Sequence, residues 1–135
     1  MFAELLRQRL GSHVKLSANQ VGQLEKHFNL LNKWNKTLNL TSIRDAGEII
    51  ERHYCESLFL GIHLPTGPLR IADVGSGAGF PGFPLAVLRP DCLVALVESH
   101  QRKSVFLREA TRELRNIQVI AKRIEDVAET FEWIV

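Results

Sequence analysis

Apolar residues recur at helical spacing through the first half of the chain. The clearest helix starts after Ser17, where Gln20 three residues later completes a capping box. Its apolar stripe ends at Trp34, which the spacing places in the core rather than on a base-stacking surface. The stripe consists of Val21, Leu24, Phe28, Leu31 and Trp34. A shorter helix is expected over Phe2–Leu10, ended by Gly11.

A third helix is expected to begin at Asp45, because Glu48 repeats the capping pattern, and to continue to about Leu60. Its inner face would be formed by Ile49, Ile50, Tyr54 and Leu58. On its outer face His53 and Glu56 lie three residues apart. These two side chains could reach each other or a substrate, and of the two we expect a hydrogen bond between them at the helix surface.

The pattern changes after the turn-forming segment Pro65–Pro68. The apolar runs Leu69–Val74 and Cys92–Val97 indicate strands that are buried on both faces of a parallel sheet. A short helix is expected between them, over Pro81–Leu88. The elements expected after these are a helix over Gln101–Leu114, a strand over Ile117–Ala121, a loop over 122–126 and a fourth strand within Phe131–Val135.

This order of elements predicts an α/β fold with a Rossmann-like sheet, of which the chain holds the first strands, and an N-terminal helical extension. We place the boundary at the proline segment, with a helical region over 1–64 and the sheet region over 65–135. A chain of 135 residues allows one domain with a core large enough to fold without disulfides or metals.

The loop after the first strand is the expected position of the ligand site. Its sequence is Asp73-Val-Gly-Ser-Gly-Ala-Gly79, and these glycines permit positive φ and leave no Cβ between the backbone and a ligand. Glu98 follows the second strand, so its carboxylate would lie at the same sheet edge and could accept hydrogen bonds from ribose hydroxyls. The unit therefore predicts a nucleoside site.

The details of this loop narrow the choice of ligand. A dinucleotide fingerprint requires G-x-G-x-x-G, and Phe80 occupies its third glycine position; the lysine of a P-loop is absent. Asp73 would repel an anionic pyrophosphate but would tolerate a ligand with an ammonium and a sulfonium group. The loop resembles motif I of class I S-adenosylmethionine-dependent methyltransferases. An NAD-type oxidoreductase and a glycine turn without a ligand remain as alternatives.

The composition indicates the compartment in which the protein is expected to work. Hydrophobic residues make up 45% and charged residues 24%, as in ordinary soluble domains. No apolar run is long enough to span a membrane, and the N-terminus lacks the apolar core of a signal peptide. Cys55 and Cys92 match no metal-binding spacing. We therefore expect a reduced, cytoplasmic protein with no membrane partner and no metal.

Positive charge is concentrated in one segment, although the net charge is only +2. Arg108, Arg112 and Arg115 follow i, i+4 and i+7 spacing, which would place them on one face of the predicted helix. That face is either solvated or contacts the phosphates of an RNA. A non-catalytic RNA-binding module is therefore a further alternative.

Several segments resemble the bacterial small-subunit (16S) ribosomal RNA methyltransferase G family, also called glucose-inhibited division protein B. Motif I continues here into Gly79-Phe-Pro-Gly82, which is more specific than motif I alone. The other similar segments are Asn39–Ile43, Glu51–Leu58, Leu96–Ser99, Phe106–Glu109 and Arg123–Asp126.

The resemblance implies an enzyme that uses S-adenosylmethionine to methylate guanine N7 in 16S ribosomal RNA, with the free RNA or the small ribosomal subunit as its partner. It also implies a set of cofactor-binding residues. Gly75, Gly77 and Phe80 would surround the methionine and ribose, Glu98 would hold the ribose hydroxyls, and Ile124 and Glu125 would border the adenine. We assign no catalytic residue, because guanine N7 presents a lone pair and no proton and so needs no general base.

The chain departs from the family pattern in two ways. Glu56 stands where the family often has aspartate. Family members also continue for several more strands, so we expect this chain to be a C-terminally shortened form of such an enzyme.

Overall fold

The computed structural model describes residues 1–135 and contains a helical N-terminal part followed by a parallel sheet. The helical part consists of α1 (Phe2–Leu10), α2 (Ala18–Trp34), α3 (Ala46–Ile49), the π-helix η1 (Ile50–Cys55) and α4 (Glu56–His63). The second part consists of β1 (Arg70–Val74), α5 (Gly82–Leu88), β2 (Leu93–Val97), α6 (Gln101–Ala110), β3 (Ile117–Ile120), the 3₁₀ turn η2 (Ile124–Asp126) and β4 (Trp133–Ile134). None of the helices combines the length and the hydropathy that a membrane crossing requires.

The predicted helix starts are confirmed by their hydrogen bonds. Ser17 Oγ accepts from the Gln20 N–H at 3.1 Å, and Gln20 Oε1 accepts from the Ser17 N–H at 2.8 Å. Asp45 Oδ2 accepts from the Glu48 N–H at 3.0 Å. These bonds satisfy N–H groups that have no partner within the first turn of a helix. Trp34 packs against the core, as the apolar spacing predicts.

The third helix differs from the prediction in its middle. It runs without a break from α3 to α4, but six residues of it, η1, are wound as a π-helix. Ile49, Ile50, Tyr54 and Leu58 are nevertheless all buried, as expected. Apolar spacing over so short a stretch does not distinguish a π-turn from an α-turn, and π-turns inside helices often occur at functional sites.

The four predicted strands form one parallel sheet in the order β3-β2-β1-β4. Ile71 pairs with Val94, Val97 with Ile120, and Ala72 with Ile134. The chain moves outward from β1 to β3 and then returns to the other side of β1 with β4. The point where the order reverses lies at the carboxyl end of β1, where doubly wound sheets bind ligands.

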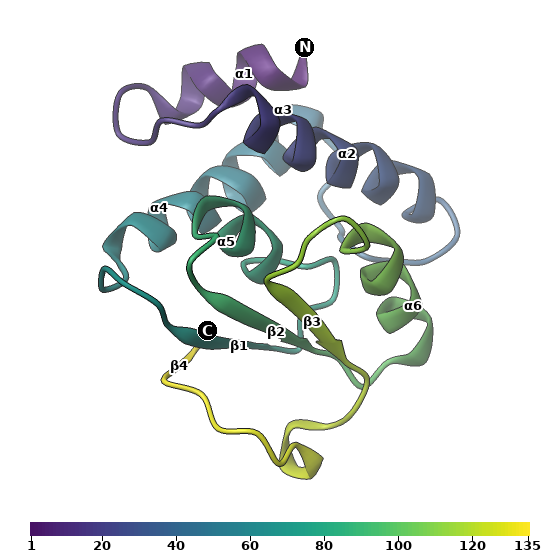
Figure 1. The fold of residues 1–135 in the computed structure, drawn as a ribbon. Helices are drawn as coiled ribbons and strands as arrows, with labels where there is room; N and C mark the ends of the chain where they lie inside the picture. The colour runs from purple at the N-terminus through teal and green to yellow at the C-terminus, as the bar shows by residue number, and fades with distance from the viewer.

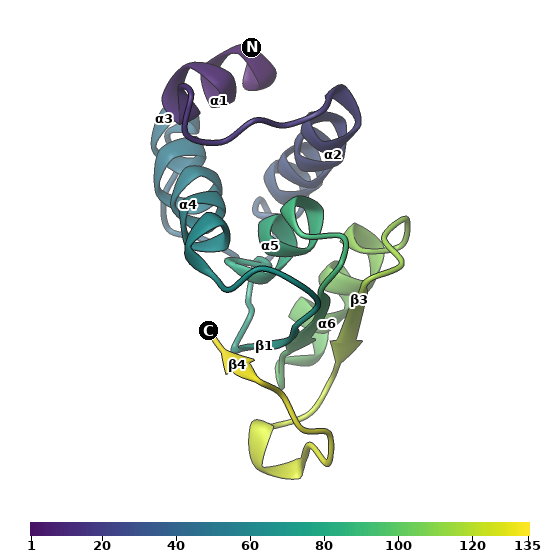
Figure 2. The same ribbon diagram turned by 60° about the vertical axis from the view of Figure 1, so that its left-hand side comes forward.

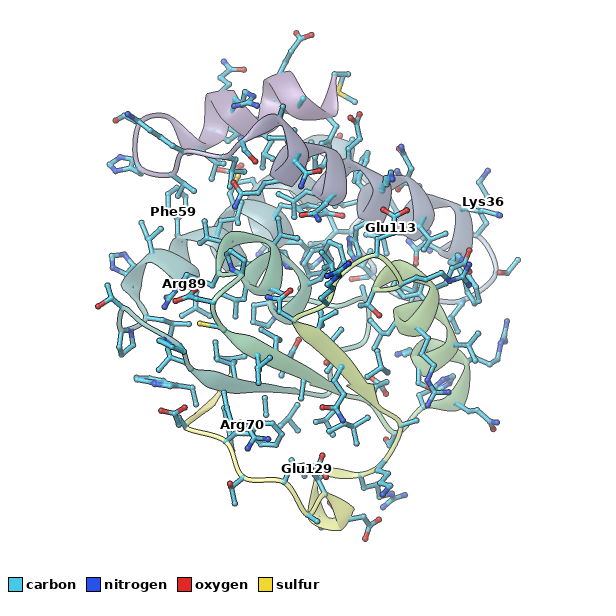
Figure 3. The ribbon with its side chains drawn as sticks, in the orientation of Figure 1. Lys36, Phe59, Arg70, Arg89, Glu113 and Glu129 are labelled. Carbon is cyan, nitrogen blue, oxygen red and sulfur yellow. The ribbon has the colours of Figure 1, made fainter.

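Figures 1 and 2 show α5 and α6 on one side of the sheet, with the N-terminal helices packed beyond them. The segment between β3 and β4 passes along the opposite side (Figure 1). Alternate residues of β2 follow this division, because Val94 and Leu96 belong to the main core whereas Ala95 and Val97 pack with Ile120. Below the sheet, the Arg70 guanidinium lies 5.6 Å from the centre of the Phe131 ring (Figure 3).

The helical and sheet regions meet at the Pro65–Pro68 segment but share one core. The 27 buried residues of the main cluster extend from Phe2 to Leu107. Arg89 fastens the connecting segment, because its Nη2 donates to the carbonyl oxygens of Pro65 at 2.8 Å and Gly67 at 3.0 Å (Figure 3). Hydrogen bonds to charged donors of this kind hold a loop at a defined position.

The predicted helix over Gln101–Leu114 is too long by four residues. Helix α6 ends at Ala110, so Arg112 and Arg115 lie in the turn before β3 and do not share a helix face with Arg108. The turn is held by Asn116, whose Nδ2 donates to three carbonyl oxygens. They belong to Ala86, Arg89 and Cys92, at 2.9, 3.2 and 3.1 Å. These tertiary bonds hold the chain just before β3, so it leaves the helix after Ala110 although its apolar pattern would allow the helix to continue.

Candidate functional site

The glycine loop follows β1 at the switch point of the sheet. Gly75 and Gly77 have φ angles of 73° and 55°, a region that side-chain-bearing residues rarely adopt. A Cβ on Gly75 would meet no atom within 4 Å, and one on Gly77 would meet only the Gly75 carbonyl oxygen at 4.0 Å. The space above both residues is therefore open, as a ligand that approaches the backbone requires.

Glu98 follows the last residue of β2 and contacts this loop through its side chain. Its Oε1 accepts from the Gly77 N–H at 2.7 Å and its Oε2 accepts from the His100 N–H at 2.9 Å. Two bonds occupy only about half of the acceptor positions of a carboxylate, so each oxygen retains capacity for a ligand hydroxyl. The residue is only 8% exposed. The predicted pairing of glycine loop and acid is therefore present in the structure.

Ile124 and Glu125 lie farther along the same edge of the sheet, in η2. Since Val97 pairs with Ile120, the carboxyl end of β3 lies beside the strand end that presents Glu98. Both residues are exposed, and the nearest ionic partner of Glu125 is Arg123 at 4.0 Å. The structure thus brings Gly77 and Glu98 into contact and places Ile124 and Glu125 on the adjoining turn.

Phe80 packs toward the N-terminal helices. Its ring stacks on His53 with centroids 4.5 Å apart and meets Tyr54 edge-on at 4.9 Å. His53 does not bond to Glu56 as predicted; its Nε2 lies 2.9 Å from Thr41 Oγ1, and burial lowers its pKa. The stack on Phe80 turns the imidazole toward the glycine loop and away from the outer helix surface.

Asp73 is buried behind the loop and has a structural partner. Its Oδ2 accepts from the Gly82 N–H at 2.9 Å, and burial raises the pKa of this carboxyl to about 7. Gly82 has no room for a side chain, because a Cβ there would run into Leu96 Cδ2 and lie 2.7 Å from Asp73 Oδ2. Asp73 and Gly82 therefore join β1 to the start of α5.

His27 is a buried polar residue that the sequence patterns did not single out. Its Nδ1 lies 2.6 Å from the Tyr54 hydroxyl, and its Nε2 lies 2.8 Å from the carbonyl oxygen of Ala78, inside the glycine loop. Burial lowers the pKa of His27 to about 4. The spacing contained a signal, because position 27 follows Leu24 by three residues and precedes Leu31 by four, so it falls on the apolar stripe.

Two solved structures that share this fold are methyltransferases. One is a protein-L-isoaspartate O-methyltransferase from Plasmodium falciparum in complex with S-adenosyl-L-homocysteine, with a TM-score of 0.59 and 17% identity over 98% of this chain and 71% of that chain. Another is a coclaurine N-methyltransferase, with a TM-score of 0.54 and 19% identity over 98% of this chain and 46% of that chain. The fold is therefore that of the class I methyltransferases, as predicted.

The comparison of sequences identifies the family within this class. A family model described as rRNA small subunit methyltransferase G matches residues 20–135. Ribosomal RNA small subunit methyltransferase G of Chromobacterium violaceum is 43% identical over 125 residues, and that of Roseiflexus castenholzii is 41% identical over 126 residues. These matches cover 91% and 92% of this chain but 59% and 54% of the two relatives. The chain belongs to the rRNA small subunit methyltransferase G family, and it spans little more than half the length of these relatives.

Proposed function

We propose that this chain forms the cofactor-binding part of an enzyme that methylates guanine N7 of 16S ribosomal RNA with S-adenosylmethionine. The observation that carries the proposal is the contact between the Glu98 carboxylate and the Gly77 N–H under an open glycine loop, in a member of this family. The relatives' names support an rRNA substrate, and the two neighbouring structures were solved with S-adenosyl-L-homocysteine.

The residues at the site fit a nucleoside cofactor. Glu98 would accept from the two ribose hydroxyls, because its carboxylate is already oriented by two backbone N–H groups. Gly75 and Gly77 would let the methionine and ribose approach the backbone. Ile124 and Glu125 would border the adenine on the adjoining turn. Phe80 would border the methionine and ribose, with its ring held in place by the stack on His53.

The chemistry would need little from the side chains of this chain. The cofactor supplies a methyl group already activated on a sulfonium, and guanine N7 offers its lone pair without losing a proton. The protein's contribution would be to hold the two groups in line and to exclude water from them. No side chain at the site is therefore assigned as an acid or a base.

The RNA partner would be recognised in part through phosphates. Arg102 lies in the first turn of α6 after β2, and Lys122 and Arg123 follow β3. All three are exposed at the sheet edge that presents Glu98. Basic side chains at that edge would contact the RNA backbone near the methylated base without reading its sequence.

Isothermal titration calorimetry with S-adenosyl-L-homocysteine tests the proposal. Glu98→Ala should weaken binding by roughly 1.5–3 kcal/mol, the usual range for a hydrogen bond to a charged group. Glu129→Ala is the matched control, because Glu129 is an exposed carboxylate in the segment between η2 and β4 (Figure 3). Equal affinities of wild type and Glu98→Ala would refute the assignment. Heat released with NAD instead would favour an oxidoreductase, and RNA binding that S-adenosyl-L-homocysteine does not change would favour a simple RNA-binding module.

A further inference from the structure

A chain of buried hydrogen bonds connects the N-terminal helices to the glycine loop. It starts at Tyr54 in η1, passes through His27 in α2, and ends at the carbonyl oxygen of Ala78 between Gly77 and Gly79. Tyr54 is fully buried and His27 is 1% exposed. These two residues come from the helical region, whereas the loop belongs to the sheet region.

The direction of these bonds follows from the chemistry of the partners. A carbonyl oxygen only accepts, so Nε2 of His27 must be the protonated nitrogen and must donate to Ala78. In the neutral imidazole Nδ1 is then an acceptor, and the Tyr54 hydroxyl donates to it. The lowered pKa of His27 agrees with a neutral ring. Each polar atom in the chain is therefore satisfied in one arrangement only.

The surroundings leave the imidazole little freedom to move. Its ring stacks on Phe83 of α5 at 4.4 Å and meets Phe106 edge-on at 5.8 Å. Gly79 passes so close that a Cβ there would lie 3.2 Å from Nε2. The loop therefore packs against His27 at Gly79, whereas the space beside Gly75 and Gly77 is open.

We propose that Tyr54 and His27 are positioning residues, which hold the glycine loop in the shape that aims the Gly77 N–H at Glu98. The N-terminal helices would then be part of the cofactor site without touching the cofactor. This inference rests on the proposed function where it concerns cofactor affinity, but its claim about the loop stands on the contacts alone. An alternative is that His27 is only a core residue with satisfied hydrogen bonds.

Two variants and one control separate these explanations. Tyr54→Phe removes the hydroxyl and keeps the ring, and His27→Phe removes both hydrogen bonds and keeps an aromatic ring. Leu24→Val is the control, because Leu24 is fully buried on the same helix but outside the hydrogen-bond chain. This variant should lower the stability of the core and leave the hydrogen bonds of His27 and Tyr54 in place.

The first measurement is amide hydrogen exchange by NMR in the absence of ligand. The Gly77 and Gly79 amides donate to Glu98 and to the Ser76 carbonyl oxygen, so their protection reports the shape of the loop. Tyr54→Phe should speed exchange at these two amides about tenfold relative to amides of β2, since losing one buried hydrogen bond is worth about a factor of ten. His27→Phe, which removes both bonds, should speed it at least as much. Leu24→Val should change loop and β2 amides by the same factor.

The second measurement is the affinity of the same proteins for S-adenosyl-L-homocysteine. This affinity should fall about tenfold in Tyr54→Phe and His27→Phe and should stay within twofold of the wild-type value in Leu24→Val. Wild-type protection of the loop amides in Tyr54→Phe, relative to β2, would overturn the inference even if His27→Phe fails to fold. If the wild type does not bind S-adenosyl-L-homocysteine, the proposed function fails. The exchange experiment still decides whether Tyr54 and His27 position the loop.

Discussion

Asp73 and His27 should give the stability of this fold two opposing dependences on pH. Burial raises the pKa of Asp73 from 3.8 to about 7 and lowers the pKa of His27 from 6.5 to about 4. Between pH 4 and 7 the folded state keeps a proton on Asp73 that the unfolded chain has released, so this group makes stability fall as the pH rises. Below pH 6.5 the unfolded chain holds a proton on His27 that the folded state lacks, so this group makes stability rise with pH.

The two contributions are similar in size. A difference of one bound proton changes the free energy of unfolding by about 1.4 kcal/mol per pH unit. The shift of Asp73 covers about three pH units and that of His27 about two and a half. The full effects are therefore on the order of 4 and 3 kcal/mol, and in the wild type they largely cancel where they overlap.

Single substitutions should reveal each contribution. Asp73→Asn keeps an oxygen for the Gly82 N–H but cannot titrate, so its stability relative to wild type should rise by about 4 kcal/mol from pH 4 to pH 7. His27→Gln should fall relative to wild type by about 3 kcal/mol from pH 4 to pH 6.5.

Urea unfolding at half-unit pH intervals from pH 4 to 8 measures these differences, because subtracting the wild-type curve removes the titration of all other groups. The double variant should show the sum of the two changes. A difference curve for Asp73→Asn that is flat across this range would mean that Asp73 titrates at its ordinary pKa, and the argument from its burial would be wrong.

Substitutions at Gly82 and Asn116 test the packing around the loop and the turn after α6, and both are measured by urea unfolding. Gly82→Ala should cost about 1–3 kcal/mol, because its Cβ has no room beside Leu96 and Asp73, whereas Gly22→Ala in α2 should gain about 0.5–1 kcal/mol, because nothing lies within 4 Å of its Cβ. An equal response of the two glycines would contradict the clash at Gly82. Asn116→Ala should cost about 1–3 kcal/mol by removing the amide that donates to three partly buried carbonyl oxygens, and Asn116→Asp should cost more because it directs oxygens at them. A neutral Asn116→Ala would show that water replaces the amide.

The elements that sequence patterns predicted correctly depend on contacts between near neighbours. The capping bonds of Ser17 with Gln20 span three residues, and the parallel βαβ unit follows from the order of its apolar runs. The end of α6 was predicted wrongly, and the turn that follows it is held by Asn116, whose partners lie 24 to 30 residues away. The same limit explains why Arg108, Arg112 and Arg115 do not share the predicted helix face, since helical spacing places residues on one face only while the helix continues.

At the site too, contacts between residues that are distant in the chain could not be predicted, as the glycine motif shows. Its residues serve two different purposes: Gly75 and Gly77 face open space, whereas Gly79 and Gly82 are small because His27, Leu96 and Asp73 lie against them. The sequence predicted the first purpose, because a glycine loop between a strand and a helix has a known relation to ligands. It could not predict the second, because His27 lies 51 residues before Ala78 in the chain. A substitution of Gly79 or Gly82 should therefore act on the fold first and on ligand binding only as a consequence, so loss of binding in such a variant does not by itself identify a ligand contact.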